Sequence, residues 1–338
     1  MIIGVINEKS SFETRVAVMP KSVESFIKSK YEVLIEAGAG EASEVSDKMF
    51  QKAGAKIKQN QIDVLRQADI LLKVQPPLSN QIKFLKSGAI VIGDFQNLAD
   101  KQVLADLKNN DNICFALDKL PRISRAQPFD VLSSQNNLAG YQSVIKAVSL
   151  AKKAVPMMVT AAGVVAPLKF LIVGIGVAGL QAIATAKRLG AKVYAYDVRE
   201  EVKEQVKSLN AVFVAKISEV LSEVDVIITS AFTIGKRAPL LLDAKALKKV
   251  KKGAIIIDLA AGFGGNVEGV CNFRLKKEGD ILIYGNSNLA AELPVTASTL
   301  LANNLANFVE YLIKDANKKL RINWADELIN DACIVKGK

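Results

Sequence analysis

The feature that most constrains the fold is the stretch from Lys169 to Arg199, KFLIVGIGVAGLQAIATAKRLGAKVYAYDVR. Residues 170–173 are a short apolar run that includes two β-branched residues, as in a short buried parallel strand. They lead into a G-x-G-x-x-G at Gly174–Gly179, an amphipathic stretch at 180–189, and a second strand that ends at Asp197. This succession predicts a parallel α/β unit that binds a dinucleotide. A glycine-rich turn in an ordinary α/β core is the alternative.

Each part of this pattern has its own physical role. Gly174 permits the tight turn, Gly176 lets a pyrophosphate approach the helix N-terminus, and Gly179 lets the helix pack closely on the strand. Asp197 is placed to accept hydrogen bonds from the adenosine ribose. A carboxylate would repel a 2′-phosphate and so favours NAD, whereas Arg199 leaves NADP open.

Length and composition suit a two-domain α/β protein. The chain has 338 residues, of which 50% are hydrophobic and 6% aromatic, enough for a sizeable core. The net charge of +11 is compatible with anionic ligands, but the lysines are scattered and the densest group, 245–252, resembles a solvated helix end. Without a basic stripe interleaved with aromatic residues, we expect no nucleic-acid partner.

The reactive residue types exclude several mechanisms. The chain has no histidine, which rules out an imidazole base, a histidine triad or a histidine-ligated metal. Cys114, Cys271 and Cys333 are far apart and in no metal-binding spacing, so we expect a reducing cytosol and no metal.

One apolar segment, Val155–Leu168, resembles a membrane span but is too short and contains two prolines. We expect it to be buried beside the nucleotide-binding fold. No signal peptide precedes the first predicted strand, so a soluble chain is expected.

The whole chain is expected to form two Rossmann-like α/β domains with parallel sheets and a cleft between them. The predicted boundaries are 1–133 plus 313–338 for the N-terminal domain and 134–312 for the NAD(H)-binding domain. The strands expected in the first domain are 2–6, 32–36, 70–74, 89–93 and 113–116, with helices at 20–29 and 101–108. In this domain Arg15 and Lys73 are expected either in the cleft or on a solvated surface.

A polar loop bounded by prolines, 121–130, is expected to be rigid and rich in hydrogen-bonding groups. A helix capped by Ser133 or Ser134 follows and extends to about Ala154. The second domain continues with strands at 225–229, 254–258 and 281–284, whose ends carry small or polar residues, and a helix from 294 to about 314.

Four motifs of the chain resemble the NAD(H)-binding domain I of proton-translocating transhydrogenase: RISRAQ-x-x-D-V-L-S-S-Q-x-N-x-A-G-Y, MMVTAAG, GIGVAGLQAIATAKRLGA and YDVR. The length of the chain resembles that of the separate soluble α subunit of split bacterial forms. The resemblance implies direct hydride transfer from NAD(H) here to NADP(H) on a partner, coupled to proton translocation. It also implies a homodimer that is cytoplasmic and peripheral on the inner face of the cell membrane. Its partners would be the membrane-embedded and NADP(H)-binding subunits.

Position by position, the resemblance assigns Arg122, Gln127, Asp130 and Ser133 to the catalytic loop around the nicotinamide. The residues it assigns to cofactor binding are Ile123, Ser124, Gly174, Gly176, Val177, Ala178, Gly179, Asp197, Val198, Arg199, Ala231 and Phe232. We also expect Arg122 and Asp130 to pair across the loop.

Three features depart from the family pattern. Pro128-Phe129 replaces what is commonly a small residue followed by methionine, and Phe232 stands where leucine is usual. The interval 210–225 is too short for the family's mobile loop. A catalytically degenerate, regulatory NAD-binding subunit is therefore one alternative function.

The other alternative is an alanine dehydrogenase-like amino- or keto-acid oxidoreductase. That chemistry needs a proton donor as well as a hydride, and the family's histidine and aspartate correspond here to Gln96 and Gly262. Transfer between two nicotinamide rings moves only a hydride, so a histidine-free site suits it better.

Overall fold

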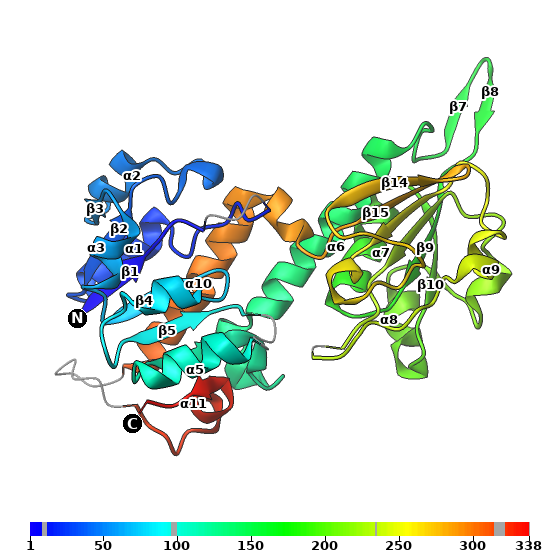
Figure 1. Ribbon diagram of the computed structural model, residues 1–338. Helices are drawn as coiled ribbons and strands as arrows, with labels where there is room; N and C mark the ends of the chain where they lie inside the picture. The colour runs from blue at the N-terminus through cyan, green and yellow to red at the C-terminus, as the bar shows by residue number, and fades with distance from the viewer. Residues whose placement is uncertain (9–11, 96–99, 234, 314–321, 338) are drawn as a thin grey trace. The chain divides into compact units, whose positions relative to one another are not determined.

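The computed structural model describes residues 1–8, 12–95, 100–233, 235–313 and 322–337 (Figure 1). The chain divides into two compact units, Met1–Gln135 with Leu293–Lys338, and Asn136–Glu292. The expected domain boundaries near 133 and 312 stay a prediction, and Gln96 and residue 314 lie outside the described residues.

The first unit is built on a sheet with strand order β16-β6-β5-β4-β1-β2-β3, parallel except for β16. Its strands are β1 Ile2–Val5, β2 Glu32–Glu36, β3 Lys56–Lys58, β4 Ile70–Lys73, β5 Ile90–Gly93, β6 Ile113–Ala116 and β16 Cys333–Val335. All the strands predicted for residues 1–116 are present, each within a residue of its expected ends. The edge strands β3 and β16 were not predicted.

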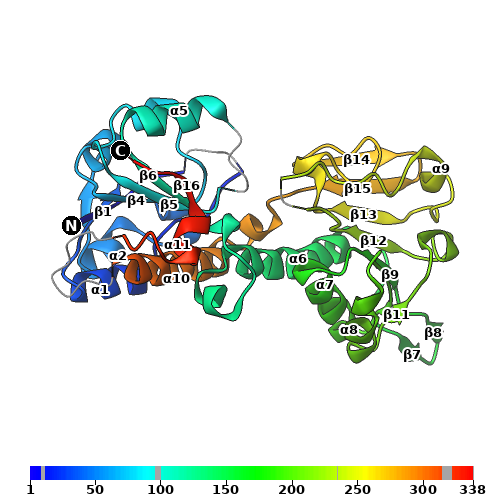
Figure 2. The same ribbon diagram turned by 90° about the horizontal axis from the view of Figure 1, so that it is seen from below.

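Helices cover both faces of this sheet, as Figure 2 shows with α5 on one side and α1 and α10 on the other. The helices of the unit are α1 Pro20–Lys28, α2 Asp47–Lys52, α3 Gln61–Leu65, α4 Ser79–Ile82, α5 Lys101–Asn109, α10 Pro294–Leu312 and α11 Glu327–Ala332. Short 3₁₀ turns lie at η1 Glu41–Ser43, η2 Leu117–Lys119 and η3 Ser124–Phe129.

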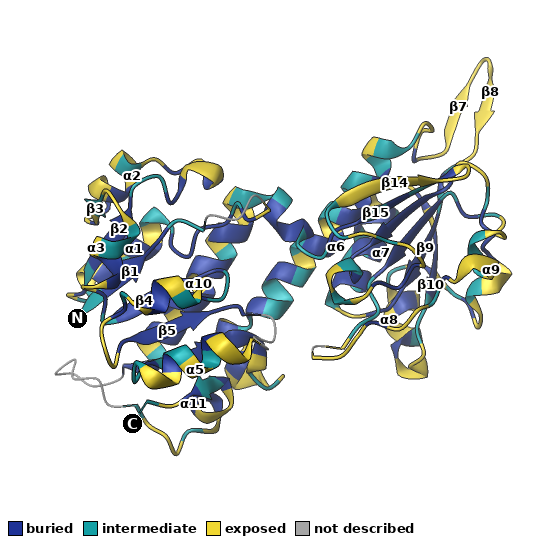
Figure 3. Ribbon diagram, viewed as in Figure 1, coloured by how far each residue is buried: buried dark blue, intermediate teal, exposed yellow. Residues whose placement is uncertain are grey.

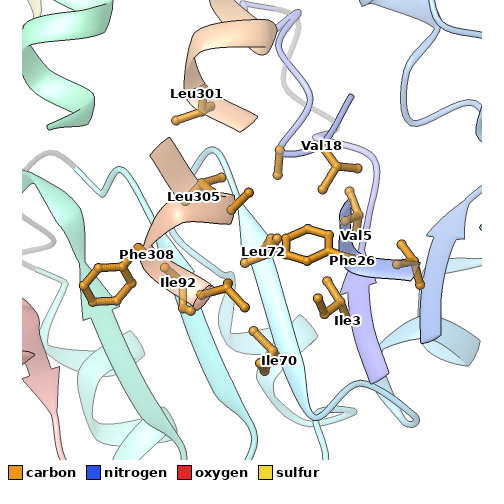
Figure 4. Close-up of a cluster of buried hydrophobic side chains, with 14 of the residues drawn as sticks. Ile3, Val5, Val18, Phe26, Ile70, Leu72, Ile92, Leu301, Leu305 and Phe308 are labelled. Carbon is orange, nitrogen blue, oxygen red and sulfur yellow. The ribbon is translucent and has the colours of Figure 1, made fainter. Parts of the chain in front are cut away.

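The core beneath α10 explains why this helix belongs to the first unit. Leu301, Leu305 and Phe308 recur on one helical face and are fully buried. They pack over β4 and β5, next to Leu72 and Ile92 (Figure 4). Complete burial of each such side chain contributes about 1.5–3 kcal/mol, so the apolar stripe fixes α10 on this sheet.

The second unit has strand order β11-β10-β9-β12-β13-β15-β14, parallel except for β14. Its strands are β9 Lys169–Val173, β10 Lys192–Tyr196, β11 Val212–Phe213, β12 Val226–Thr229, β13 Ile255–Asp258, β14 Arg274–Glu278 and β15 Ile281–Gly285. The chain moves outward from β9 to β11 and then returns to place β12 on the other side of β9. The switch in direction between β9 and β12 is the point where ligands bind in open α/β sheets.

Four helices belong wholly or partly to the described part of this unit: α6 Val131–Leu150, α7 Val177–Arg188, α8 Lys203–Ser208 and α9 Ala244–Leu247. Its 3₁₀ turns are η4 Glu200–Val202, η5 Ile217–Glu219, η6 Ala261–Phe263 and η7 Leu289–Glu292. The expected helix at 134–154 is therefore real but begins at Val131, so the prediction that Ser133 or Ser134 caps it is wrong. Instead, the Asp130 carboxylate accepts the Ser133 backbone N–H at 2.8 Å.

The segment Val155–Leu168 is not buried as expected. It forms an antiparallel hairpin of β7 Met158–Thr160 and β8 Gly163–Val165, and residues 156–166 are exposed, whereas Val155 and Leu168 at the two ends are buried. Figure 3 shows the hairpin in yellow, projecting from the second unit. Composition alone misled the prediction, because an apolar run does not reveal whether a neighbour covers it. No helix within the described residues is long and apolar enough to cross a membrane.

Candidate functional site

The glycine turn after β9 has the geometry that a phosphate-binding turn requires. Gly174 has φ +92°, and a Cβ on Gly179 would lie 2.0 Å from the Gly174 carbonyl oxygen, so neither position accepts another residue without strain. A Cβ on Gly176 would meet nothing within 4 Å. Gly176 is also the N-cap residue of α7 and has no side chain to occupy the first free N–H groups. The turn therefore offers open space at a helix N-terminus, where anions are favoured.

Asp197 at the end of β10 is tied to this turn. One carboxylate oxygen, Oδ2, accepts the Ile175 backbone N–H at 2.6 Å, and Oδ1 accepts the Arg199 backbone N–H at 2.9 Å. Burial raises the pKa of Asp197, but the hydrogen bonds from Arg199 and Ile175 outweigh it and hold that pKa below its ordinary value. The residue is thus an ionised acceptor beside the glycine turn.

Arg199 is engaged by the same groups. Its guanidinium donates to both oxygens of Asp197, and its Nη2 also donates to the Ile175 carbonyl at 3.0 Å. Its positive charge therefore balances Asp197. Arg199 was the residue that kept NADP possible as the cofactor in the sequence analysis. In the structure its guanidinium is paired with Asp197.

A cavity of about 420 Å³ opens beside Asp197 at the ends of β10 and β11. Its lining residues are Tyr196, Asp197, Val198, Glu200, Lys203, Phe213 and Ala215. The Lys203 ammonium lies 5.4 Å from the centre of the Phe213 ring and 3.1 Å from a Glu200 oxygen. A cavity that joins an ionised acid to an aromatic wall can accept the adenosine end of a nucleotide.

Beyond β11 the chain returns directly to the sheet. Residues 214–225 connect β11 to β12, and Val214, Val220, Leu221 and Val224 are buried in the core of the second unit. This connection is short, and these four side chains hold it against the core, whereas residues 215, 216, 218, 219 and 222 are exposed.

A buried frame holds the loops that follow β12 and β13. The Asp258 carboxylate accepts the backbone N–H groups of Ala260 and Asn266, each at 2.8 Å. The Asn266 amide then accepts the Ala231 N–H at 3.0 Å and donates to the Ala231 carbonyl at 2.7 Å, as a neighbouring strand would. Burial raises the pKa of Asp258 despite these hydrogen bonds. Ala231, predicted to bind cofactor, is therefore rigidly placed next to Gly174.

Sequence reasoning did not assign Asp258 or Asn266 to the site. The available signal was their position after a buried strand, since the carboxyl ends of parallel strands meet at the ligand edge of the sheet. Phe263 was also missed, although its ring stacks on Phe232.

The predicted catalytic loop lies in the first unit as the 3₁₀ turn η3, Ser124–Phe129, with its flanks. Arg122, Ile123, Ser124 and Gln127 are exposed. Phe129 is buried, with its ring centre 4.9 Å from that of Tyr311 and 5.7 Å from that of Phe308. The exposed polar residues of this loop are thus held in place by the buried ring of Phe129.

Hydrogen bonds fix the loop further. The Pro128 carbonyl accepts the Asn304 amide at 2.9 Å, and Arg125 pairs with Asp326 at 3.0 Å. The departure Pro128-Phe129 therefore fastens the loop to the helix α10.

The expected ion pair between Arg122 and Asp130 is wrong: among the described residues these two side chains form no salt bridge. Asp130 instead accepts two hydrogen bonds from Ser133, from the backbone N–H at 2.8 Å and from Oγ at 2.5 Å. Ser133 can satisfy the carboxylate because α6 begins early enough to place it one turn away. The exposed Arg122 guanidinium therefore lies apart from its expected partner.

Arg15 and Lys73 are buried, so their alternative as solvated surface residues is wrong. The Arg15 guanidinium contacts both oxygens of Glu13 at 2.8 Å and donates to Gln135 at 2.9 Å. Lys73 pairs with Glu8 at 2.6 Å. Both cations are thus neutralised within the first unit.

The structure groups the predicted site residues by unit. Residues 174–179, 197–199 and 231–232 gather at the carboxyl edge of the second sheet, whereas Arg122, Gln127 and Asp130 share one loop of the first unit. Across the described ranges, no group of three or more His, Cys, Asp and Glu side chains could hold a metal ion.

These observations define a Rossmann-like, two-domain α/β protein with a nucleotide-type glycine turn. Family models described as "Alanine dehydrogenase/PNT, N-terminal domain" and "Alanine dehydrogenase/PNT, C-terminal domain" match residues 4–139 and 143–338. The chain belongs to the alanine dehydrogenase/PNT family.

Similar proteins are transhydrogenase subunits. The chain is 36% identical to the first part of NAD(P) transhydrogenase subunit alpha of Rickettsia prowazekii, covering 99% of this chain and 95% of the relative. The protein of the same name from Rhodospirillum rubrum is 36% identical, over 99% of this chain and 96% of its own length. The crystal structure of transhydrogenase from Sinorhizobium meliloti has a TM-score of 0.93 at 39% identity, covering 100% of this chain and 98% of that one.

The alignment also shows a difference in length. The alignment with the Rickettsia protein extends over 367 positions, whereas this chain has 338 residues, so the relative has positions that this chain lacks.

Proposed function

We propose that this chain is the NAD(H)-binding subunit of a proton-translocating transhydrogenase, exchanging hydride with NADP(H) on a partner subunit. The observation that carries the proposal is the hydrogen bond from the Ile175 N–H in the glycine turn to the Asp197 carboxylate, 2.6 Å long. This hydrogen bond joins the glycine turn, which we propose to bind the pyrophosphate, to Asp197, which we propose to accept hydrogen bonds from the ribose. The similarity of the chain to transhydrogenase α subunits supports the same function.

In the proposed reaction the residues of this chain bind and orient. The nicotinamide supplies the hydride when bound, and no protein acid or base is required. Gly174, Gly176 and Gly179 accommodate the pyrophosphate, and Asp197 accepts from the adenosine ribose. The exposed side chains of Arg122 and Gln127, on a loop held by Phe129, set the position of the nicotinamide, together with the half-buried Ser133 in the first turn of α6. NAD(H) is the cofactor of this chain in the proposal, with NADP(H) on the partner and no metal.

Alanine dehydrogenase-like chemistry has less support in this chain. It needs a proton donor and a site for the substrate carboxylate, but there is no histidine, and Arg15 and Lys73 already hold internal carboxylates. At Gly262 a Cβ would lie 2.3 Å from Ser287 Oγ and 2.9 Å from Asn272 Nδ2, so an aspartate there requires both to move. Oxidation of alanine with NAD by the chain alone would overturn the proposal.

The short connection 214–225 favours a second candidate, an NAD-binding subunit without catalysis. Such a subunit would bind NADH yet exchange no hydride with competent partner subunits. Measuring both NADH binding and hydride exchange therefore separates a catalytic subunit from a subunit that only binds NAD.

The proposal includes a homodimer attached to the inner face of the cell membrane through membrane-embedded and NADP(H)-binding subunits. The exposed hairpin β7–β8 supports self-association, because Val159 is 73% and Val164 68% exposed. Monomers rarely leave such contiguous apolar residues in water. A second copy of this chain is the partner we propose for the hairpin.

The deciding experiment is a titration of the purified chain with NADH and with NADPH, followed by a hydride-exchange assay with an NADP(H)-binding partner subunit. Preferential NADH binding and partner-dependent exchange are expected. Failure to bind NADH would contradict the proposal as a whole.

A further inference from the structure

Two phenylalanine rings stack at the carboxyl edge of the second sheet. The Phe232 and Phe263 ring centres are 4.7 Å apart and their planes differ by 8°. Phe232 follows β12 and Phe263 ends the turn after β13. Both rings are half-buried, so the stack borders solvent and is not part of a core cluster.

The stack is held from both sides. Asn266 holds Ala231, the residue before Phe232, through its N–H at 3.0 Å and its carbonyl at 2.7 Å. The Phe263 carbonyl accepts the Ala238 N–H at 2.8 Å, which joins the two loops a second time. The backbone on which the two rings stand is thus held by hydrogen bonds, so their closeness does not depend on mutual contact alone.

The strand order indicates which half of a dinucleotide would reach this stack. Asp197 at the end of β10 marks the adenosine side, and the glycine turn after β9 marks the pyrophosphate. The order β10-β9-β12-β13 places Phe232 and Phe263 across the turn from Asp197. A dinucleotide extended across the switch point therefore has its nicotinamide half on the side of the stack.

We propose that Phe232 and Phe263 form an aromatic platform that contacts the nicotinamide ring of NAD(H) and shields it from water. This inference rests on the proposed function and adds Phe263 to the proposed site as a residue that contacts the cofactor. Planar rings gain affinity by packing against aromatic side chains. The short connection 214–225 leaves no long segment between β11 and β12 to cover the site, which gives the platform a distinct role.

The test compares a whole dinucleotide with its adenosine half. NADH and ADP are titrated into the wild-type chain and the Phe263→Leu and Phe263→Tyr variants, and the emission of bound NADH is recorded. Phe263→Leu is expected to weaken NADH about tenfold, the change produced by about 1.4 kcal/mol of lost stacking. In Phe263→Leu, ADP affinity and thermal midpoint should stay unchanged, and the emission of bound NADH should shift toward that in water. Phe263→Tyr, which keeps an aromatic ring, should behave as the wild type does.

The remaining outcomes overturn the inference in distinguishable ways. Unchanged NADH affinity in Phe263→Leu, with wild-type binding intact, removes the platform and leaves the proposed function standing. Equal weakening of NADH and ADP, or a lowered thermal midpoint that accounts for the loss, reduces Phe263 to a packing residue. No NADH binding by the wild-type chain contradicts the proposed function itself.

Discussion

Arg199 lies across the carboxylate of Asp197, with Nε 3.0 Å from Oδ1 and Nη2 3.1 Å from Oδ2. The Arg199 side chain is half exposed, whereas that of Asp197 is almost covered. A ribose that binds Asp197 must therefore share this carboxylate with a half-exposed cation. In the proposed function, cofactor choice therefore depends on the pair and not on the acid alone.

Replacing Asp197 by alanine should weaken NADH binding by roughly 1–3 kcal/mol, because an ionised hydrogen-bond acceptor is lost. Calorimetric titration measures the change. Glu204→Ala is the matched control, since Glu204 is an exposed acid on α8 that does not line the cavity and should have little effect. If the wild-type chain binds NADPH as tightly as NADH, the assignment of Asp197 to the ribose is wrong.

Replacing Val159 by aspartate should dissociate the proposed homodimer. A charge placed in an apolar interface without a partner costs about 3 kcal/mol or more. Sedimentation velocity should show a dimer for the wild-type chain and a monomer for Val159→Asp, with unchanged circular dichroism. Leu240→Asp is the control, because Leu240 is 55% exposed but lies outside the hairpin. A wild-type monomer, or a dimer that survives the change, would exclude the hairpin as the contact.

Removing the charge of Glu13 should destabilise the first unit. Burial raises the Glu13 pKa, but the charge and hydrogen bonds of Arg15 outweigh it and lower the pKa below its ordinary 4.5. Glu13→Gln leaves Arg15 buried without its anion, which costs about 3–5 kcal/mol at neutral pH. The comparison variant Glu32→Gln breaks an exposed pair with Lys56 and should cost at most about 1 kcal/mol.

The pH dependence of this effect has a defined sign. Because the folded pKa of Glu13 is depressed, its stabilising contribution is complete above pH 4.5 and is lost as the pH falls through the folded value. The difference in unfolding free energy between wild type and Glu13→Gln should therefore shrink in acid. A difference that stays constant from neutral pH to well below the ordinary pKa of a glutamate would show that the ion pair is not its origin.

The inner parallel strands could be predicted closely because each is a largely apolar run bounded by turn residues, as with Ile70–Lys73 and Ile255–Asp258. The edge strands gave no such signal: β14, Arg274–Glu278, is charged and exposed and is specified by its antiparallel pairing with β15. The hairpin at 158–165 was misread for the opposite reason, since its apolar residues face water.

The glycine turn and Asp197 were predictable because both belong to one local strand–turn–helix pattern. The hydrogen bonds that hold the neighbouring loop were not predictable, since Asn266 bonds Ala231 across 35 residues of sequence. The stack of Phe232 on Phe263 likewise depends on two separate strands meeting at one edge. In the loop 121–130 the sequence indicated polar groups, but it did not indicate that the Asp130 carboxylate would accept hydrogen bonds from Ser133 and form no ion pair with Arg122.

The last prediction separates catalysis from bracing in the loop 122–130. Gln127 is exposed and Phe129 is buried, so the two residues divide these roles within one 3₁₀ turn. Gln127→Asn shortens a surface side chain by one methylene, which should leave thermal stability and NADH affinity nearly unchanged. If Gln127 positions the nicotinamide, a misplacement of about 1 Å should lower hydride exchange some 10²-fold.

Phe129→Ala is the matched bracing variant and should lose about 3–5 kcal/mol of stability, because a buried aromatic ring is deleted. Its exchange rate should fall only as far as the folded fraction falls or the loop is displaced. Exchange is measured with a purified NADP(H)-binding subunit, and stability by thermal unfolding of the same samples. Full exchange activity in Gln127→Asn would remove Gln127 from the site, and a loss of stability in that variant would assign the whole loop to bracing.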